Sequence, residues 1–302
     1  MPILERLPGQ TRSLREILRS HRDWLEKRGG DRADLSNQSF VRQDLQGLDL
    51  RRAILRGTIF IEANLSNSDL SGADLRGANL EGSTAHQIDL NGAELSLTNF
   101  SRALLGGANF SDANIEESRL CECVLRDCRF FDARLHASDF AGAKLHGAQL
   151  NRARIVECSL KGADLSGTRF LRARLKATKF IDATLEDASF EGAEVDDCDF
   201  RGAQGLGTRF ASTNLTRSVF RRSAFASCDF RSADLSFADL SYALLRGSFF
   251  EDAKLLGTDL RAADLSGARA LRPAQLGEAW TSNATVLPSG RRGPYVRGIP
   301  IY

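Results

Sequence analysis

The sequence is poor in several residues that a mixed α/β enzyme of this size usually contains in larger numbers. Its 302 residues include 1 methionine, 2 tryptophans, 3 tyrosines and 6 prolines. No stretch approaches the ~18 uninterrupted apolar residues of a membrane span, and no long apolar segment follows the N-terminus. The formal net charge of +2 excludes both a strongly basic nucleic-acid binder and a strongly acidic chain. We therefore expect a soluble cytoplasmic protein that neither crosses nor binds a membrane.

The sequence also lacks the motifs of catalysis and metal binding. It has no phosphate-binding glycine loop, no zinc-protease motif and no nucleophile elbow. The 6 cysteines are not spaced as a disulfide framework or a zinc site, and they are consistent with a reducing compartment. Among them, Cys121 is expected to be the one that faces solvent. The prediction is a protein that is not an enzyme and holds no cofactor and no metal.

A period of five residues dominates what is present. From Leu35 to Leu265, every position ending in 5 or 0 is Leu, Phe, Ile or Val, except Ala85 and Gly205, and a small residue usually lies two positions earlier. Residues two apart in an extended segment point to the same side, so both side chains of each repeat enter one interior. The other two positions are rich in Gly, Ser, Asp and Arg, which suit a corner. The chain is therefore predicted to coil as alternating short strands and corners.

The phenylalanines indicate how many repeats close one coil. Fourteen of the 15 that occupy central positions lie at numbers ending in 0, and Phe225 is the exception. This alternation requires an even number of faces, and four faces of twenty residues per coil is the closure that encloses a core without a void. The 47 repeats then give about twelve coils. In this arrangement Phe225 lies one coil beyond Gly205, and its ring is expected to fill the space that the glycine leaves.

These repeats resemble a known family. Residues 63–67 (ANLSN), 73–80 (ADLRGANL) and 163–167 (ADLSG) are similar to the A(D/N)LXX signature of pentapeptide-repeat proteins. The resemblance implies an all-β solenoid, a right-handed quadrilateral β-helix, and a non-enzymatic role in binding. The acidic or amide residue before the central Leu, as at Asp69, Asp74 and Asn79, is expected to bond the nearby backbone rather than to catalyse.

The two ends of a solenoid expose unpaired strand edges that must be covered. Residues 11–28 are predicted to form an amphipathic helix, with a capping box at Ser13 and Glu16. A short helix is expected from Pro273 to Trp280, followed by an irregular tail. The apolar residues of that tail could fold back or dock a partner: Tyr295, Ile299, Ile301 and Tyr302. The predicted domains are an N-terminal helical cap (1–34), the β-helix (35–268) and a C-terminal cap and tail (269–302).

Charge is distributed in bands along the repeats. The net charge is −5 over residues 35–118, +7 over 119–180 and −6 over 181–265. In the basic band Arg134, Arg154 and Arg174 are spaced by twenty, so they are expected to stack on one face, with Arg152 and Arg172 beside them. These five arginines are the candidate partner-binding residues. The candidate apolar contact residues are Phe131, Phe237, Tyr242 and Phe249.

Three functions are compatible with these features. The first is an interaction scaffold that binds a protein partner through its surface. The second, implied by the resemblance, is a DNA mimic that binds a type II topoisomerase such as gyrase and confers inhibitor or quinolone resistance. The third is an accessory or effector protein of a bacterial secretion system. Direct nucleic-acid binding is disfavoured because the basic band is short and has few exposed aromatics. The sequence leaves open the partner's identity and the oligomeric state, a homodimer included.

Overall fold

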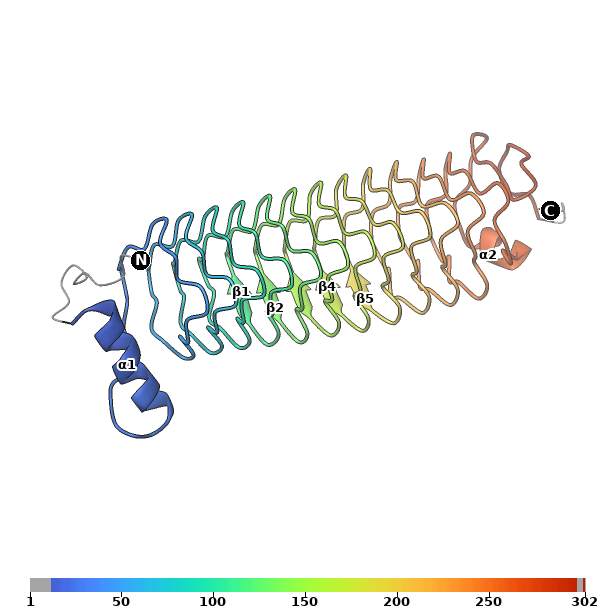
Figure 1. Ribbon diagram of the computed structural model, residues 1–302. Coiled ribbons are helices and arrows are strands. Elements are labelled where there is room, and N and C mark those ends of the chain that lie inside the picture. Colours follow the sequence, from blue (N-terminus) through green and yellow to red (C-terminus); the bar gives the residue numbers. More distant parts are fainter. Residues whose placement is uncertain (1–11, 298–300, 302) are drawn as a thin grey trace. The chain divides into compact units, whose positions relative to one another are not determined.

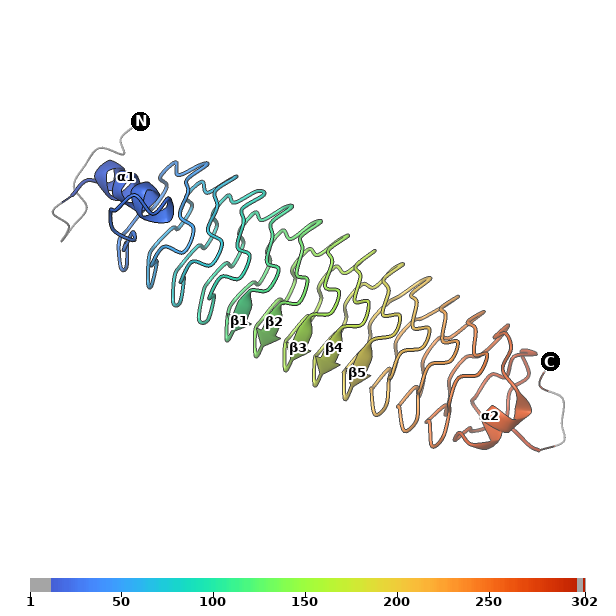
Figure 2. The ribbon, with the colours of Figure 1, turned by 90° about the horizontal axis from the view of Figure 1, so that it is seen from below.

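The computed structural model describes residues 12–297 and 301, and the chain divides into two compact units. We call Met1–Lys144 the N-terminal unit and Leu145–Tyr302 the C-terminal unit. Each unit is a parallel β-solenoid whose coils follow one another in sequence order (Figures 1 and 2). No helix among the described residues is long and apolar enough to cross a membrane.

Backbone pairing repeats every twenty residues in both units. In the N-terminal unit Asp34 pairs with Ile54 and Ile54 with Asp74, and in the C-terminal unit Gln204 pairs with Ala224 and Ala224 with Leu244, all in parallel. The predicted coil of four five-residue sides is therefore confirmed. Because successive coils within each unit are hydrogen-bonded to each other, the described residues of the coils have their packing partners close in sequence.

Three-residue strands occur only between residues 114 and 196 of the described chain. They are β1 (Asn114–Glu116) and β2 (Arg134–His136) in the N-terminal unit, and β3 (Arg154–Val156), β4 (Arg174–Lys176) and β5 (Glu194–Asp196) in the C-terminal unit. These strands cover about four turns of the solenoid. The number of turns that carry strands therefore differs from the expected count of about twelve coils. Elsewhere the coils are joined by isolated single-residue bridges. The reason is local: a hydrogen-bonded corner interrupts the extended backbone after each central residue, as where the Ala53 nitrogen donates to the Leu50 oxygen at 3.0 Å.

Phenylalanine rings fill the interior in stacked columns. In the C-terminal unit Phe170, Phe190 and Phe210 stack at centroid separations of 4.5 and 5.1 Å, and Phe180 and Phe200 stack at 4.7 Å. The two columns meet edge to face, as at Phe180 and Phe190 with an interplanar angle of 82°. Stacked neighbours twenty apart and edge-on neighbours ten apart confirm that the bulky rings occupy opposite faces of the coil.

The pairing of Phe225 with Gly205 is also confirmed. Phe225 is fully buried and makes edge-to-face contacts with three ring neighbours, of which Phe220 is the nearest at 5.4 Å between centroids. A Cβ added to Gly205 would lie 2.6 Å from the Phe225 Cδ1, closer than any real contact. The ring therefore occupies the volume that the glycine leaves empty.

The small inward residue often carries a hydroxyl or thiol, and this group bonds the neighbouring coil. Thr98 donates to the Leu75 oxygen at 3.0 Å, and Thr208 donates to the Leu185 oxygen at 2.8 Å, in each case 23 residues earlier. Cys128 donates to the Leu105 oxygen at 3.0 Å in the same way. These bonds satisfy buried polar groups that would otherwise be costly. The sequence analysis treated the position as merely small and did not predict them.

The expected side-chain bonds to the corner backbone are confirmed. Asp69 Oδ1 accepts from the Ser71 nitrogen at 2.9 Å, and Asn79 Oδ1 accepts from the Glu81 nitrogen at 3.0 Å. Asp74 accepts from the Arg76 nitrogen at 3.3 Å. The residue before the central Leu thus holds the corner, which is a structural role.

Helix α1 (Leu14–Leu25) begins directly after the predicted capping residue Ser13 and is shorter than the expected range of 11–28. Ser13 Oγ accepts from the Glu16 nitrogen at 3.4 Å, and Glu16 Oε2 accepts from the Ser13 nitrogen at 2.7 Å, so the capping box is confirmed. The buried His21 accepts from the Ala33 nitrogen at 3.0 Å through Nδ1. This bond ties the helix to the start of the first coil.

Helix α2 (Pro273–Gly277) is shorter than the expected span to Trp280. It ends at Gly277, a residue that disfavours a helix interior. Trp280 instead pairs with Asp259, and its carbonyl accepts from the Leu260 nitrogen at 2.8 Å. Farther along, Ile301 is buried and its carbonyl accepts from the Ser289 nitrogen at 2.9 Å, so this part of the tail folds back. Ile299 and Tyr302, the other apolar ends of the predicted tail, lie outside the described residues.

Candidate functional site

Two of the candidate arginines are brought together on the C-terminal unit. Arg154 of β3 pairs in register with Arg174 of β4, and both side chains are exposed. Arg174 in turn pairs with Glu194 of β5, and their side chains form an ion pair at 3.4 Å in which both remain more than half exposed, at 69% and 61%. This face therefore passes from basic to acidic over one coil.

The remaining candidate arginines are exposed on their own units. Arg134 belongs to β2 of the N-terminal unit, where it pairs in register with Asn114 and is exposed. Arg152 and Arg172 lie on the C-terminal unit and are exposed at corners, with left-handed φ angles of 60° and 55°. The Arg152 nitrogen donates to the Leu171 oxygen at 3.0 Å, which fixes the corner against the next coil.

Arg154 and Arg174 occupy the position that holds the corner elsewhere in the repeat. Aspartate or asparagine at that position accepts a backbone hydrogen bond, as Asp164 does from the Ser166 nitrogen at 3.1 Å. A guanidinium has no acceptor and cannot form this bond. In addition, like charges directly opposite each other on adjacent strands are destabilising. These two arginines therefore do not hold their corners as aspartate does, and the exposed ion pair of Arg174 with Glu194 contributes little to stability.

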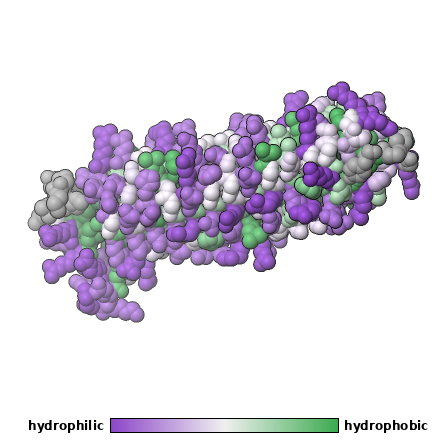
Figure 3. Space-filling model, turned by 45° about the vertical axis from the view of Figure 1, so that its right-hand side comes forward, coloured by the Kyte–Doolittle hydropathy of each residue, from purple (hydrophilic) through white to green (hydrophobic). Residues whose placement is uncertain are grey.

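The four candidate apolar residues are not gathered at one place. Phe237 and Tyr242 are exposed, at 63% and 51%, whereas Phe131 and Phe249 are half-buried. Phe249 lies under a guanidinium, with Arg269 Cζ 5.1 Å from its ring centroid. Figure 3 shows the same dispersed character on one face of the molecule, where apolar residues form small groups among hydrophilic ones.

One apolar group on the C-terminal unit was missed by the sequence analysis. Leu206 and Leu244 are exposed, at 58% and 44%, and Ala224, which pairs with Leu244, lies half-buried between their coils. The sequence could have predicted this apolar group. Its three members lie next to the central positions 205, 225 and 245, and the residues next to central positions are usually polar in this chain.

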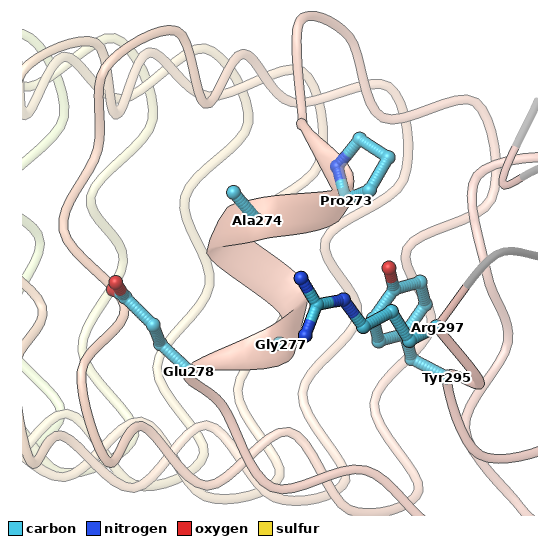
Figure 4. Close-up of a pocket in the computed structure, with 6 residues that line it drawn as sticks. All are labelled: Pro273, Ala274, Gly277, Glu278, Tyr295 and Arg297. Atoms are coloured by element: carbon cyan, nitrogen blue, oxygen red, sulfur yellow. The ribbon is translucent and has the colours of Figure 1, made fainter.

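A pocket of about 740 Å³ lies beside α2 (Figure 4). The Tyr295 ring packs against Gly277, where an added Cβ would lie 3.8 Å from its Cε1. Figure 4 shows Glu278 pointing away from Arg297, so the pocket does not bring an acid and a base together. It is lined by Pro273, Ala274, Gly277, Glu278, Tyr295 and Arg297.

The cysteines are not arranged for chemistry. Five are buried and Cys121 is half-buried, and all six are free thiols. Burial raises the pKa of Cys121 to about 11, and its thiol donates to the Asp139 oxygen at 3.7 Å. No group of three or more metal-ligating side chains occurs among the residues that the structure describes.

Models of pentapeptide repeats match most of the chain. The model described as pentapeptide repeats (8 copies) matches five segments within residues 44–127 and 207–269, and the one described as a pentapeptide repeat region matches 133–210. The chain belongs to the pentapeptide-repeat family. Proteins of this family are generally non-enzymatic scaffolds.

Several solved pentapeptide-repeat structures are similar to this chain. HetL, from the cyanobacterium Nostoc sp. strain PCC 7120 and involved in heterocyst differentiation regulation, is 25% identical and aligns over 90% of this chain and 96% of its own, with a TM-score of 0.33. QnrB1, a plasmid-mediated fluoroquinolone resistance protein, is 21% identical over 64% of this chain and 84% of its own, with a TM-score of 0.31. A thylakoid-lumen protein from Arabidopsis thaliana is 31% identical over 32% of this chain and 67% of its own, with a TM-score of 0.22.

These TM-scores are low, so the alignments carry no argument about function, and family membership rests on the repeat models. No curated protein matches the chain.

Proposed function

We propose that this pentapeptide-repeat protein is a non-enzymatic scaffold that binds an acidic surface of a protein partner. The proposed contact is centred on Arg154 and Arg174 of the C-terminal unit, with Arg152 and Arg172 at the corners of the same coils. Arginine suits this role because its planar fork meets a carboxylate through two hydrogen bonds.

The observation that carries the proposal is the register pairing of Arg154 with Arg174. Two arginines stand opposite each other on adjacent strands, at the position where an aspartate would hold the corner. Like charges in this arrangement repel, Glu194 pairs with Arg174 alone, and a partner's carboxylates would relieve the remaining repulsion. A binding role accounts for two arginines at this position.

A protein surface fits this pair better than a nucleic acid. Glu194 follows Arg174 directly in the same column, and Asp196 lies at the end of the same strand. A nucleic-acid backbone needs a continuous run of cations, because each phosphate contact adds to the affinity. The short basic patch of this chain, bordered by acidic residues, is suited to a partner surface on which a few carboxylates are flanked by basic residues.

The experiment is a pull-down from the native host with wild type and two matched variants. Arg154→Glu with Arg174→Glu should abolish capture of the partner and leave the melting temperature nearly unchanged, because exposed charges contribute little to stability. Arg209→Glu with Arg231→Glu changes two exposed arginines elsewhere on the C-terminal unit and should retain capture. If the first variant still retrieves the same proteins, or wild type binds duplex DNA tightly at physiological salt, this assignment is wrong.

A second candidate, mimicry of DNA toward a type II topoisomerase, is favoured by one feature. Asp49, Asp69 and Asp89 pair in successive coils of the N-terminal unit and form an acidic column. The corner bonds explain this column in part, since Asp89 accepts from the Asn91 nitrogen at 2.9 Å. A gyrase supercoiling assay separates the candidates, because the first one predicts no inhibition by the pure protein.

A further inference from the structure

A groove crosses one corner of the C-terminal unit, away from the arginines of β3 and β4. It has a volume of about 420 Å³ and lies at the corner of Gly202, where the Asp182 carboxylate takes up the space that a side chain at 202 would need. Arginine dominates its walls, although the surrounding residues 181–265 carry a net charge of −6. The lining residues are Ile181, Asp182, Arg201, Gly202, Arg221 and Arg222.

Gly202, Arg222 and Tyr242 occupy the same corner in successive coils. All three have left-handed backbone, with φ of 67°, 61° and 60°. Glycine adopts this conformation without cost, whereas a bulky aromatic residue rarely does. The corner conformation therefore does not explain why a tyrosine stands at 242.

Tyr242 positions the two arginines. Arg221 Cζ lies 5.7 Å and Arg222 Cζ lies 5.9 Å from the centroid of its ring. A guanidinium over an aromatic ring uses its flat face for the contact and keeps its in-plane N–H donors available. The Tyr242 ring therefore holds the guanidinium groups of Arg221 and Arg222 close together and leaves their N–H donors available to a ligand.

Neither of these two guanidinium groups is hydrogen-bonded to a carboxylate among the described residues, although the charge of Arg221 helps to lower the pKa of Asp259. Arg201 is occupied by Asp199, with its Nε 2.9 Å from Oδ1. Asp259 is likewise occupied by Arg261, whose Nε lies 2.9 Å from Oδ1. Among the described residues neither Arg221 nor Arg222 forms an ion pair, and Asp182 is the one carboxylate that lines the groove.

We infer that this groove binds a phosphate monoester, carried on a phosphorylated side chain of a protein partner. Two adjacent guanidinium forks match a group with a charge of about −2 and three acceptor oxygens better than they match a single carboxylate. The small volume admits one side chain rather than a helix. This site is distinct from the proposed acidic-surface contact and does not depend on it.

A nucleic acid fits the groove less well, because acids border it. Asp239 and Asp259 pair in successive coils beside the arginines, and Asp199 lies in the same column. Asp239 would repel a phosphate next to the one that the groove holds, whereas Asp199 and Asp259 are paired with Arg201 and Arg261. An isolated phosphate on a protein side chain avoids that repulsion.

Binding is tested with four probes on the full chain: inorganic phosphate, and a glycine-flanked peptide carrying phosphoserine, serine or aspartate. Calorimetry and the NMR signals of the arginine side chains report the affinity. We expect the phosphoserine peptide to bind at least tenfold more tightly than the serine and aspartate peptides. Arg221→Gln with Arg222→Gln should lower its affinity at least tenfold, and Arg154→Gln with Arg174→Gln, the matched control, should not change it.

A second variant tests the groove without removing charge. Gly202→Asn keeps a residue that tolerates left-handed backbone, but its side chain would push the Asp182 carboxylate aside into the groove, so it should also weaken binding at least tenfold. Unchanged affinity in either groove variant, equal affinity for the aspartate peptide, no binding of the phosphoserine peptide, or tighter binding of 5′-phosphorylated single-stranded DNA would each overturn the inference. Retained partner capture by the groove variants in the pull-down would leave the proposed function intact.

Discussion

Single residues in the interior are matched in volume from coil to coil. Gly205 and Phe225 show this most clearly, because the ring of one occupies the space above the other. Ile88 gives a second case: it is bulky where small residues are usual, and it lies fully buried three residues after Ala85, which is small where large residues are usual. Such pairs keep the interior at the density of a packed core.

Phe225→Ala should destabilise the protein by about 3 to 5 kcal/mol, the usual cost of removing a buried ring. Adding Gly205→Leu should restore part of that loss, because the leucine then fills the same space. Urea denaturation of the single and double variants measures both effects.

Gly205→Ala in the wild-type background is the control that adds volume to the interior, whereas Phe225→Ala removes it. Its Cβ would collide with the Phe225 ring and with the Thr208 hydroxyl. It should cost about 1 to 3 kcal/mol, as overpacking does. A nearly neutral Phe225→Ala would show that the two residues do not share one volume.

The cysteine thiols should react slowly in the native protein. Burial raises the pKa of Cys123, Cys128, Cys198 and Cys228 to about 12, and that of Cys121 to about 11. The reactive species is the thiolate, so the half-buried Cys121 should react first but well below the rate of a free thiol. The sequence predicted that Cys121 faces solvent, whereas the structure leaves it half-buried.

Titration with a thiol reagent at pH 8, before and after addition of denaturant, measures this. Cys121→Ser should remove the first phase and leave the others. Several fast thiols in the native protein would contradict the packing of the inward position.

At the level of elements, helix α1 is held by a histidine that must stay neutral. Burial lowers the pKa of His21 below its ordinary value of 6.5, and its Nδ1 accepts from the Ala33 nitrogen. When helix α1 is detached from the first coil, His21 binds a proton near pH 6.5. When the helix is packed against the coil, His21 binds the proton only at lower pH. Docking is therefore fully stable above about pH 6.5 and weakens as the pH falls through the lowered pKa.

Trp24 reports this transition because its ring stacks on His21 at a centroid distance of 5.6 Å. In a Trp280→Phe background, Trp24 fluorescence should change as the pH falls from 8 to 4. His21→Leu should abolish the pH-dependent step, and His146→Gln, at an exposed histidine, should leave it unchanged. A step that persists in His21→Leu must come from another group.

Across the whole molecule, one ionic arrangement recurs in both units. An aspartate before a central residue binds an arginine two positions later, as Asp74 binds Arg76 at 2.7 Å and Asp259 binds Arg261 at 2.6 Å. Hydrogen bonds from Arg76, and then from Arg56, hold the pKa of Asp74 well below its ordinary value. Burial alone would raise the pKa of Asp259, but the bonds from Arg261 outweigh it and lower that pKa as well.

These lowered pKa values predict loss of stability in acid. Because the folded pKa of Asp74 lies below the unfolded one, its contribution is present above about pH 4 and is lost as the pH falls through the folded value. Asp74→Asn should therefore be less stable than wild type at pH 7, and the difference should narrow below pH 4. Urea denaturation between pH 2 and pH 7 measures this, with Glu117→Gln at an exposed position as the control. A constant difference across that range would contradict the ionic role.

The sequence by itself determined the repeat, the four-sided coil and the content of the interior. It could do so because each residue packs against the residue twenty positions away, so Phe170 meets Phe190 and Gly205 meets Phe225 without any long-range search. The helix start at Ser13 was equally local, since a capping box spans only four residues. Local and periodic contacts leave a direct trace in the order of the residues.

Only the tertiary structure decided which charged groups are occupied and which are available. Arg201 and Arg221 stand at equivalent positions of successive coils, yet the first is bound to Asp199 and the second lies over Tyr242. The bonds from Thr98 and Thr208 to carbonyls 23 residues earlier were equally invisible in the sequence. These outcomes depend on side-chain geometry between neighbouring coils, which the five-residue period does not specify.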